Sequence, residues 1–132
     1  MENNPTWLAV VALALRDNAG RILLQQRPIG RHHGGLWEFP GGKVEKEETP
    51  SLALVREIEE ELAITIDPAL LHPCAFAEEE AARHIVLLLY TSNQPCAEPV
   101  ACDGQNWGWY TLAEVNELDL APMDRTMLET ML

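Results

Sequence analysis

Several stretches of the chain have the hydrophobic pattern of β-strands. Residues 8–16 are almost continuously apolar, which is typical of a strand buried on both faces, and residues 84–92 form the clearest later strand. Residues 21–26 follow the first stretch after an Asp-Asn-Ala-Gly turn signal, so we predict that these two strands form a hairpin. Two shorter strands are predicted at residues 98–103 and 106–111.

Helices are predicted between and after these strands. A Thr-Pro pair at positions 49–50 begins a helix that should run to about Leu62, with the threonine as N-cap and the proline where no N–H is needed. Thr111 and Glu114 have the spacing of a capping box, and Pro122 starts a last amphipathic helix. This mixture predicts an α/β (α+β) fold, with a mixed sheet and helices packed on its faces.

Composition narrows the class of protein. A chain of 132 residues is expected to form a single domain over 1–132 with a sizeable core. The net charge of −12 argues against binding to a nucleic acid polymer, which needs a basic surface. Three cysteines without a CxxC pair favour a reducing, cytoplasmic setting. No apolar run reaches the about 20 residues of a membrane span, so we expect no membrane association.

Acidic residues crowd one part of the first predicted helix. On a helical wheel, Glu57, Glu60 and Glu61 fall together on the side opposite an apolar stripe. The predicted stripe consists of Leu52, Val55, Ile58 and Leu62. A solvated acidic face is the simplest interpretation, because like-charge pairs on an exposed helix cost only about 0.2–0.5 kcal/mol each. In a cleft, carboxylates about 6 Å apart repel by roughly 3 kcal/mol and need a cation, for which Mg²⁺ or Mn²⁺ suits their oxygens.

The surrounding sequence decides between these interpretations. Residues 42–64 read GKVEKEETPSLALVREIEEELAI, which resembles the Nudix box, G-x5-E-x7-R-E-U-x-E-E-x-G-U, where U is apolar. The one departure is Ala63, where a glycine would suit a left-handed helix end. Alanine in that conformation costs about 1–2 kcal/mol, and no ligand is lost. The resemblance implies an α/β/α sandwich around a mixed sheet and hydrolysis of a nucleoside diphosphate linked to another group.

The resemblance also implies roles for individual residues. An Arg56–Glu48 ion pair would brace the loop and the helix, and Glu57 or Glu60 would be the general base. Mg²⁺, with Mn²⁺ as the alternative, would be the cofactor. The implied metal ligands are the carbonyl of Gly41 and the carboxylates of Glu57, Glu60, Glu61 and Asp103. Asp103 is included because residues 102–110 resemble the MutT-like branch of the family. An Asp-Gly turn is the simpler explanation of an aspartate at this position.

Likeness to the MutT-like branch extends over most of the chain, including residues 36–45 and 82–90. That branch includes 8-oxo-dGTP diphosphatases and CTP pyrophosphohydrolases. It implies a Mg²⁺-dependent nucleoside triphosphate pyrophosphohydrolase that takes 8-oxo-dGTP, or CTP or a methylated dCTP. A catalytically silent nucleotide-binding module is the alternative from another class. In either case the protein is expected to be a monomer or a homodimer. The implied substrate-binding residues are Arg27, Lys43, Arg83 and Asp124. For Asp124, a favourable position in the first helical turn is the simpler explanation.

Overall fold

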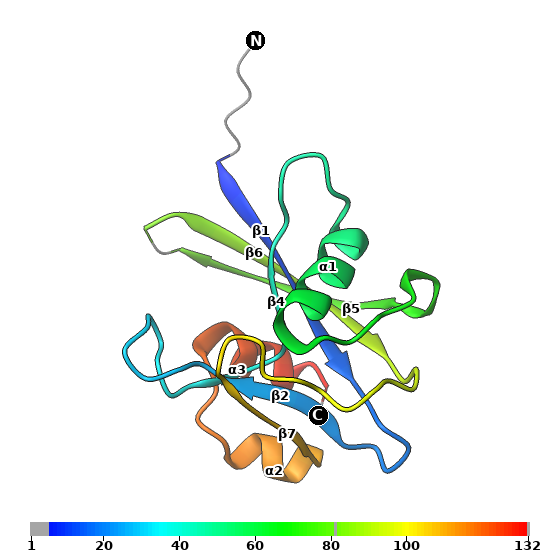
Figure 1. Cartoon of the computed structure of the whole chain (residues 1–132). Helices are drawn as coiled ribbons and strands as arrows, with labels where there is room; N and C mark the ends of the chain where they lie inside the picture. Colours follow the sequence, from blue (N-terminus) through cyan, green and yellow to red (C-terminus); the bar gives the residue numbers. More distant parts are fainter. Residues whose placement is uncertain (1–5, 81, 132) are drawn as a thin grey trace.

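The computed structural model describes residues 6–80 and 82–131 (Figure 1), so residues 1–5, 81 and 132 of the expected domain lie outside the described residues. The helices are α1 (Pro50–Leu62), α2 (Leu112–Glu117) and α3 (Pro122–Glu129), with a 3-10 turn at Pro68–Leu70. Within the described ranges, no helix is both long and apolar enough to cross a bilayer.

The strands form two sheets. The four-stranded sheet has the order β4-β1-β6-β5, with β1 at Trp7–Leu15, β4 at Gly41–Lys43, β5 at His72–Glu80 and β6 at His84–Ser92. Its strand β1 runs parallel to β6 and antiparallel to β4, so this sheet is mixed, as predicted. The second sheet is antiparallel, with the order β3-β2-β7, formed by β2 at Ile22–Gln26, β3 at Trp37–Glu38 and β7 at Asn106–Tyr110.

Helices α1 and α3 cover opposite faces of the four-stranded sheet (Figure 1). Side chains along β1 alternate between the two faces, as in any strand. Leu13 and Leu15 pack with Ile58 of α1, whereas Ala14 packs with Met127 of α3. Each fully buried leucine or isoleucine contributes about 1.5–3 kcal/mol relative to exposure. The expected α/β/α sandwich is therefore confirmed.

The predicted hairpin between residues 8–16 and 21–26 is wrong. The two strands are connected by the expected turn, but they belong to different sheets and share only the bridge between Arg16 and Ile22. Strand β1 already has β4 on one edge and β6 on the other, so it has no free edge for β2. The chain instead crosses to the second sheet, where β2 pairs with β3 and β7.

A further prediction, the strand at residues 98–103, is also wrong. This segment runs past the end of α1, where the N–H of Val100 donates to the carbonyl of Leu62 and the N–H of Cys102 donates to the carbonyl of Glu61. The last carbonyls of a helix lack partners within the helix, and this segment supplies them. Sequence reasoning assigned no element to β5, because proline and a run of three glutamates are rare in strands.

Helix α1 begins and ends where it was predicted. Thr49 is the N-cap residue, although its side chain makes no capping hydrogen bond. The buried apolar stripe of α1 is rotated from its predicted position. Leu52, which was predicted to be in the stripe, is 53% exposed, whereas Ala53 and Leu54 are fully buried. This rotation brings Glu61 from the outer side of the helix to the border of its buried side, where it is partly covered.

Ala63 adopts the left-handed conformation that its place in the motif predicted, with φ 55° and ψ 35°. Because alanine is strained there, we expect Ala63→Gly to stabilise the protein by about 1 kcal/mol, measured by chemical unfolding, with kcat unchanged within about twofold. Ala97→Gly, at an exposed loop position without positive φ, is the matched control and should destabilise the protein slightly. Equal effects of the two changes would contradict this interpretation.

Candidate active site

The guanidinium of Arg56 connects helix α1 to the loop before it. Its Nε donates to Glu48 at 2.7 Å, and its Nη2 donates both to Glu48 at 3.0 Å and to the carbonyl of Lys43 at 3.0 Å. The expected ion pair between Arg56 and Glu48 is therefore present, and it holds the pKa of the Glu48 carboxyl below its usual value. The same guanidinium also donates to Glu57 at 2.9 Å and to Glu60 at 3.1 Å.

Two glycines in β4, Gly41 and Gly42, allow this strand to lie close to β1 and to α1. A Cβ atom on Gly42 would collide with the carboxylate of Glu57, and one on Gly41 would collide with the carbonyl of Val11 in β1. These positions need glycine because β4 lies against β1 on one side and against an acidic side chain of α1 on the other.

Glu61 is the most strongly perturbed carboxylate of α1. Its Oε1 accepts a hydrogen bond from the N–H of Gly41 at 3.1 Å, and its Oε2 accepts one from the side chain of Gln25 at 3.0 Å. Burial raises its pKa to about 8, and the nearby charges of Glu57 and Glu38 act in the same direction. A cation beside this oxygen-rich group would offset both effects, so the residues present fit a hard divalent ion.

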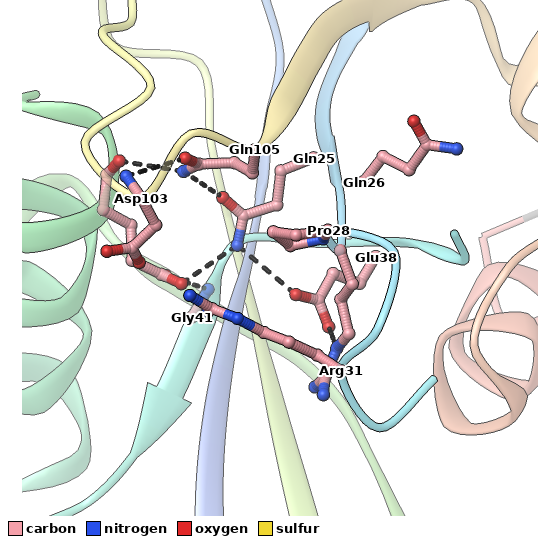
Figure 2. Close-up of a pocket in the computed structure, with 10 residues that line it drawn as sticks. Gln25, Gln26, Pro28, Arg31, Glu38, Gly41, Asp103 and Gln105 are labelled. Atoms are coloured by element: carbon pink, nitrogen blue, oxygen red, sulfur yellow. Dashed lines mark hydrogen bonds and ion pairs between the residues drawn. The ribbon is translucent and has the colours of Figure 1, made fainter. Parts of the chain in front are cut away.

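A polar cavity of about 220 Å³ opens beside Glu61 (Figure 2). Four of the residues predicted from the sequence line it, namely Gly41, Glu61, Asp103 and Arg27. Arg31, which lies in the loop after β2, adds a second positive charge to the wall. Segments far apart in the sequence thus bring carboxylates and arginines to one cavity, as an anionic ligand with a cation requires.

A second, more apolar cavity of about 210 Å³ shares Arg27, Glu38 and Gly41 with the first. Asp124 lines it and is buried, and its Oδ1 accepts a hydrogen bond from the N–H of Phe39 at 2.9 Å. Burial raises the pKa of Asp124 to about 7. Asp124 also lies in the first turn of α3, where an acidic side chain is favoured by the helix dipole. Its position is therefore also explained without any contact to a ligand.

Other predicted site residues lie elsewhere. Lys43, Glu60 and Arg83 are exposed, and none of them lines either cavity. In the described part of the chain, no three acidic, histidine or cysteine side chains are grouped closely enough to hold a metal ion. The carboxylates of Glu57 and Glu60 are turned toward Arg56 instead. A metal site built from all the predicted ligands therefore requires these two side chains to change partners.

Several residues that line the first cavity were missed by sequence reasoning, among them the polar side chains of Gln25, Glu38 and Gln105. One signal was available for Gln25, because it follows three apolar residues in β2, where a polar side chain that continues a buried strand needs a specific partner. Gln105 and Glu38 reach the cavity through contacts with segments distant in the sequence. Their local sequence therefore carried no comparable signal.

Comparison with known proteins agrees with this geometry. A family model described as a NUDIX domain matches residues 5–131. The chain belongs to the Nudix family. This Nudix protein is 36% identical over 119 residues to the CTP pyrophosphohydrolase of Escherichia coli, covering 90% of the chain and 87% of the relative.

Two further likenesses point to the same branch. This Nudix protein is 32% identical over 124 residues to the 8-oxo-dGTP diphosphatase of Escherichia coli, covering 92% of the chain and 93% of the relative. Among solved structures, a MutT Nudix hydrolase from Burkholderia pseudomallei superposes with a TM-score of 0.84 at 28% identity, covering 97% of this chain and 100% of that one. The interpretation as a Nudix hydrolase of the MutT-like branch is confirmed.

Proposed function

We propose that this Nudix hydrolase cleaves a nucleoside triphosphate into a monophosphate and pyrophosphate, with Mg²⁺ or Mn²⁺ as cofactor. The observation that carries the proposal is the pair of adjoining cavities, which share Arg27, Glu38 and Gly41. One cavity is polar and contains both arginines and carboxylates, and the other is more apolar and contains a single buried acid. A nucleotide has the same two parts, a polyanionic chain and a flat base.

The metal would be held by oxygen atoms, which Mg²⁺ and Mn²⁺ prefer. Nudix hydrolases in general need a divalent metal. The proposed ligands are the Gly41 carbonyl and the carboxylates of Glu57, Glu60, Glu61 and Asp103. Bound there, the ion supplies charge neutralisation at the phosphates and lowers the pKa of a water molecule.

Residues of the chain supply the remaining functions. Arg27 and Arg31 line the polar cavity and are placed to bind phosphate oxygens. Arg56 keeps α1 joined to the preceding loop through Glu48, and it pairs with Glu57 and Glu60, which would have to leave it to bind the ion. We propose that one of these two glutamates accepts the proton of the attacking water. Lys43 and Arg83 are exposed, so a role in substrate binding would require contacts to the outer part of the ligand.

Asp124 is proposed to contact the base. One of its oxygens already accepts the N–H of Phe39, and the acid keeps further hydrogen-bonding capacity toward the cavity. Guanine presents two N–H groups on one edge, and cytosine presents an amino group, so an acid at this position suits both bases. Two relatives are named for 8-oxo-dGTP and for CTP, whose bases are an oxidised guanine and a cytosine. We propose 8-oxo-dGTP as the substrate, with CTP or a methylated dCTP as the second candidate.

The decisive experiment measures pyrophosphate release from 8-oxo-dGTP, dGTP, CTP and 5-methyl-dCTP with Mg²⁺ and with Mn²⁺. Release from one of them, lost in Glu60→Gln, would support the proposed enzyme. Binding of nucleotide without any release would favour the silent module. In that case the acidic residues of α1 would serve ligand binding alone.

A further inference from the structure

Two buried glutamines connect the acidic helix to the rest of the cavity wall. Gln25 is 3% exposed and Gln105 is 7% exposed. Gln25 occupies a position of β2 where its three predecessors, Ile22, Leu23 and Leu24, are fully apolar and buried. Burying an amide without hydrogen bonds costs roughly 1–3 kcal/mol, so a buried glutamine is expected to have a defined set of partners.

The partners form a continuous chain of hydrogen bonds (Figure 2). The backbone N–H of Asp103 donates to Oε1 of Gln105 at 3.0 Å, and Nε2 of Gln105 donates to Oε1 of Gln25 at 3.1 Å. Nε2 of Gln25 then donates to Glu61 at 3.0 Å and to Glu38 at 3.4 Å. These hydrogen bonds thus run from the loop before β7, across β2, to carboxylates on α1 and β3.

This chain of hydrogen bonds has a fixed direction. A carboxamide has two N–H donors on one atom and its acceptor on the other, and Gln25 points its two donors at two carboxylates. Rotating this amide by half a turn would aim its oxygen at both carboxylates, which is unfavourable. Gln105 prevents the rotation, because its own Nε2 also donates to the backbone carbonyl of Glu61 at 2.9 Å and so stays in place.

The geometry points to Gln25 as a positioning residue for Glu61, a role that rests on the proposed metal-dependent function. Gln25 holds one oxygen of Glu61 while the N–H of Gly41 holds the other, so the plane of this carboxylate is fixed from both ends. Each oxygen keeps a further lone pair for a cation. Partners that orient the groups around a metal ion typically change affinity or activity by about 10–100-fold when removed.

Gln25 also links the two cavities. Its second carboxylate partner, Glu38, lines both of them and pairs with Arg27 at 2.8 Å. The Glu38–Arg27 pair has its own hydrogen bond and should persist without Gln25, whereas Glu61 would lose the partner of one oxygen. Loss of Gln25 should therefore act on the metal side of the site more than on nucleotide binding.

The test replaces Gln25 by methionine, which has a similar length and shape but no donor. Mn²⁺ binding to the nucleotide-free protein is measured by calorimetry, and kcat and KM are measured for the preferred nucleotide. We expect Mn²⁺ affinity and kcat each to fall about tenfold, with KM changed by less than about threefold. Gln94→Met is the matched control, because Gln94 is also buried and its side chain is hydrogen-bonded to Asp67 and Ser92, outside the cavities.

The outcomes separate this inference from the proposed function. Unchanged Mn²⁺ affinity in Gln25→Met, or an equal loss in Gln94→Met, would overturn the positioning role alone. Absence of Mn²⁺ binding by the unaltered protein would instead overturn the proposed metal-dependent function. Should Gln25→Met fail to fold, Gln105→Met replaces it, because that change frees the Gln25 amide to rotate. A loss of affinity there supports the role, and an unchanged affinity overturns it.

Discussion

Replacing Glu57 by glutamine should lower kcat about 10²–10⁴-fold and leave the protein folded. The glutamine is close in size, so it can remain beside Gly42, where the glutamate is now packed. It cannot accept a proton from water, and a neutral amide binds a divalent ion more weakly than a carboxylate does. Burial raises the pKa of Glu57, so the substitution removes a charge that is costly to keep in this place.

The comparison with Glu60→Gln identifies the base. Glu60 is more exposed than Glu57, although both accept hydrogen bonds from Arg56. The base should show the larger fall in kcat at saturating metal, whereas a residue that acts only as a ligand should recover part of its activity at high Mg²⁺. Steady-state rates over a range of Mg²⁺ concentrations separate the two roles.

Glu59→Gln is the matched control on the same helix. Glu59 is exposed and lies away from the other three glutamates, so kcat should stay within about twofold of the unaltered enzyme. Thermal unfolding of all three variants checks that the helix is intact. A Glu57→Gln variant as active as Glu59→Gln would contradict the assignment of the acidic helix to catalysis.

Much of the fold could be predicted from sequence where a signal is local. The ends of α1 follow from a Thr-Pro start and from a left-handed residue at Ala63, and strand β6 was predicted with its observed bounds. The capping box of α2 is also present, with reciprocal hydrogen bonds between Thr111 and Glu114. These features depend on residues within a few positions of one another, which is why the sequence alone reveals them.

Features that depend on distant segments could not be predicted. The division of strands into two sheets depends on β4 and β6 having occupied both edges of β1. The burial of Glu61 depends on contacts with Gln25 in β2 and with Gly41 in β4, neither of which a helical wheel can represent. The motif identified the acidic residues, whereas only the folded chain distinguishes the buried Glu61 from the exposed Glu60.

The second large effect is expected at Asp124, where Asp124→Asn should make the protein more stable at pH 8 and leave its stability at pH 4 nearly unchanged. The folded-state pKa of this acid is about 7, above its usual value of 3.8, mainly because of burial. The folded protein therefore binds the proton more tightly than the unfolded chain does. The resulting stability is fully present below pH ~4 and is lost as the pH rises through about 7.

Asparagine has no such titration, and its amide oxygen can still accept the N–H of Phe39. One pKa unit corresponds to about 1.4 kcal/mol, so even a partial effect should raise the unfolding temperature at pH 8 by about 5 °C or more. Unfolding temperatures of both proteins between pH 4 and pH 9 measure the difference. Parallel curves over this range would show that Asp124 is not a buried acid of raised pKa.

The same substitution tests the contact with the base. An ionised aspartate only accepts hydrogen bonds, whereas asparagine accepts on one atom and donates on the other. If Asp124 contacts the base, the ratio of kcat/KM for 8-oxo-dGTP to that for CTP should change by about 5- to 100-fold, the range of one well-placed hydrogen-bond pair. An unchanged ratio, together with the expected gain in stability at pH 8, would mean that Asp124 serves only to anchor α3 against Phe39. Base recognition would then have to come from other residues of the apolar cavity, such as His33 or Glu79.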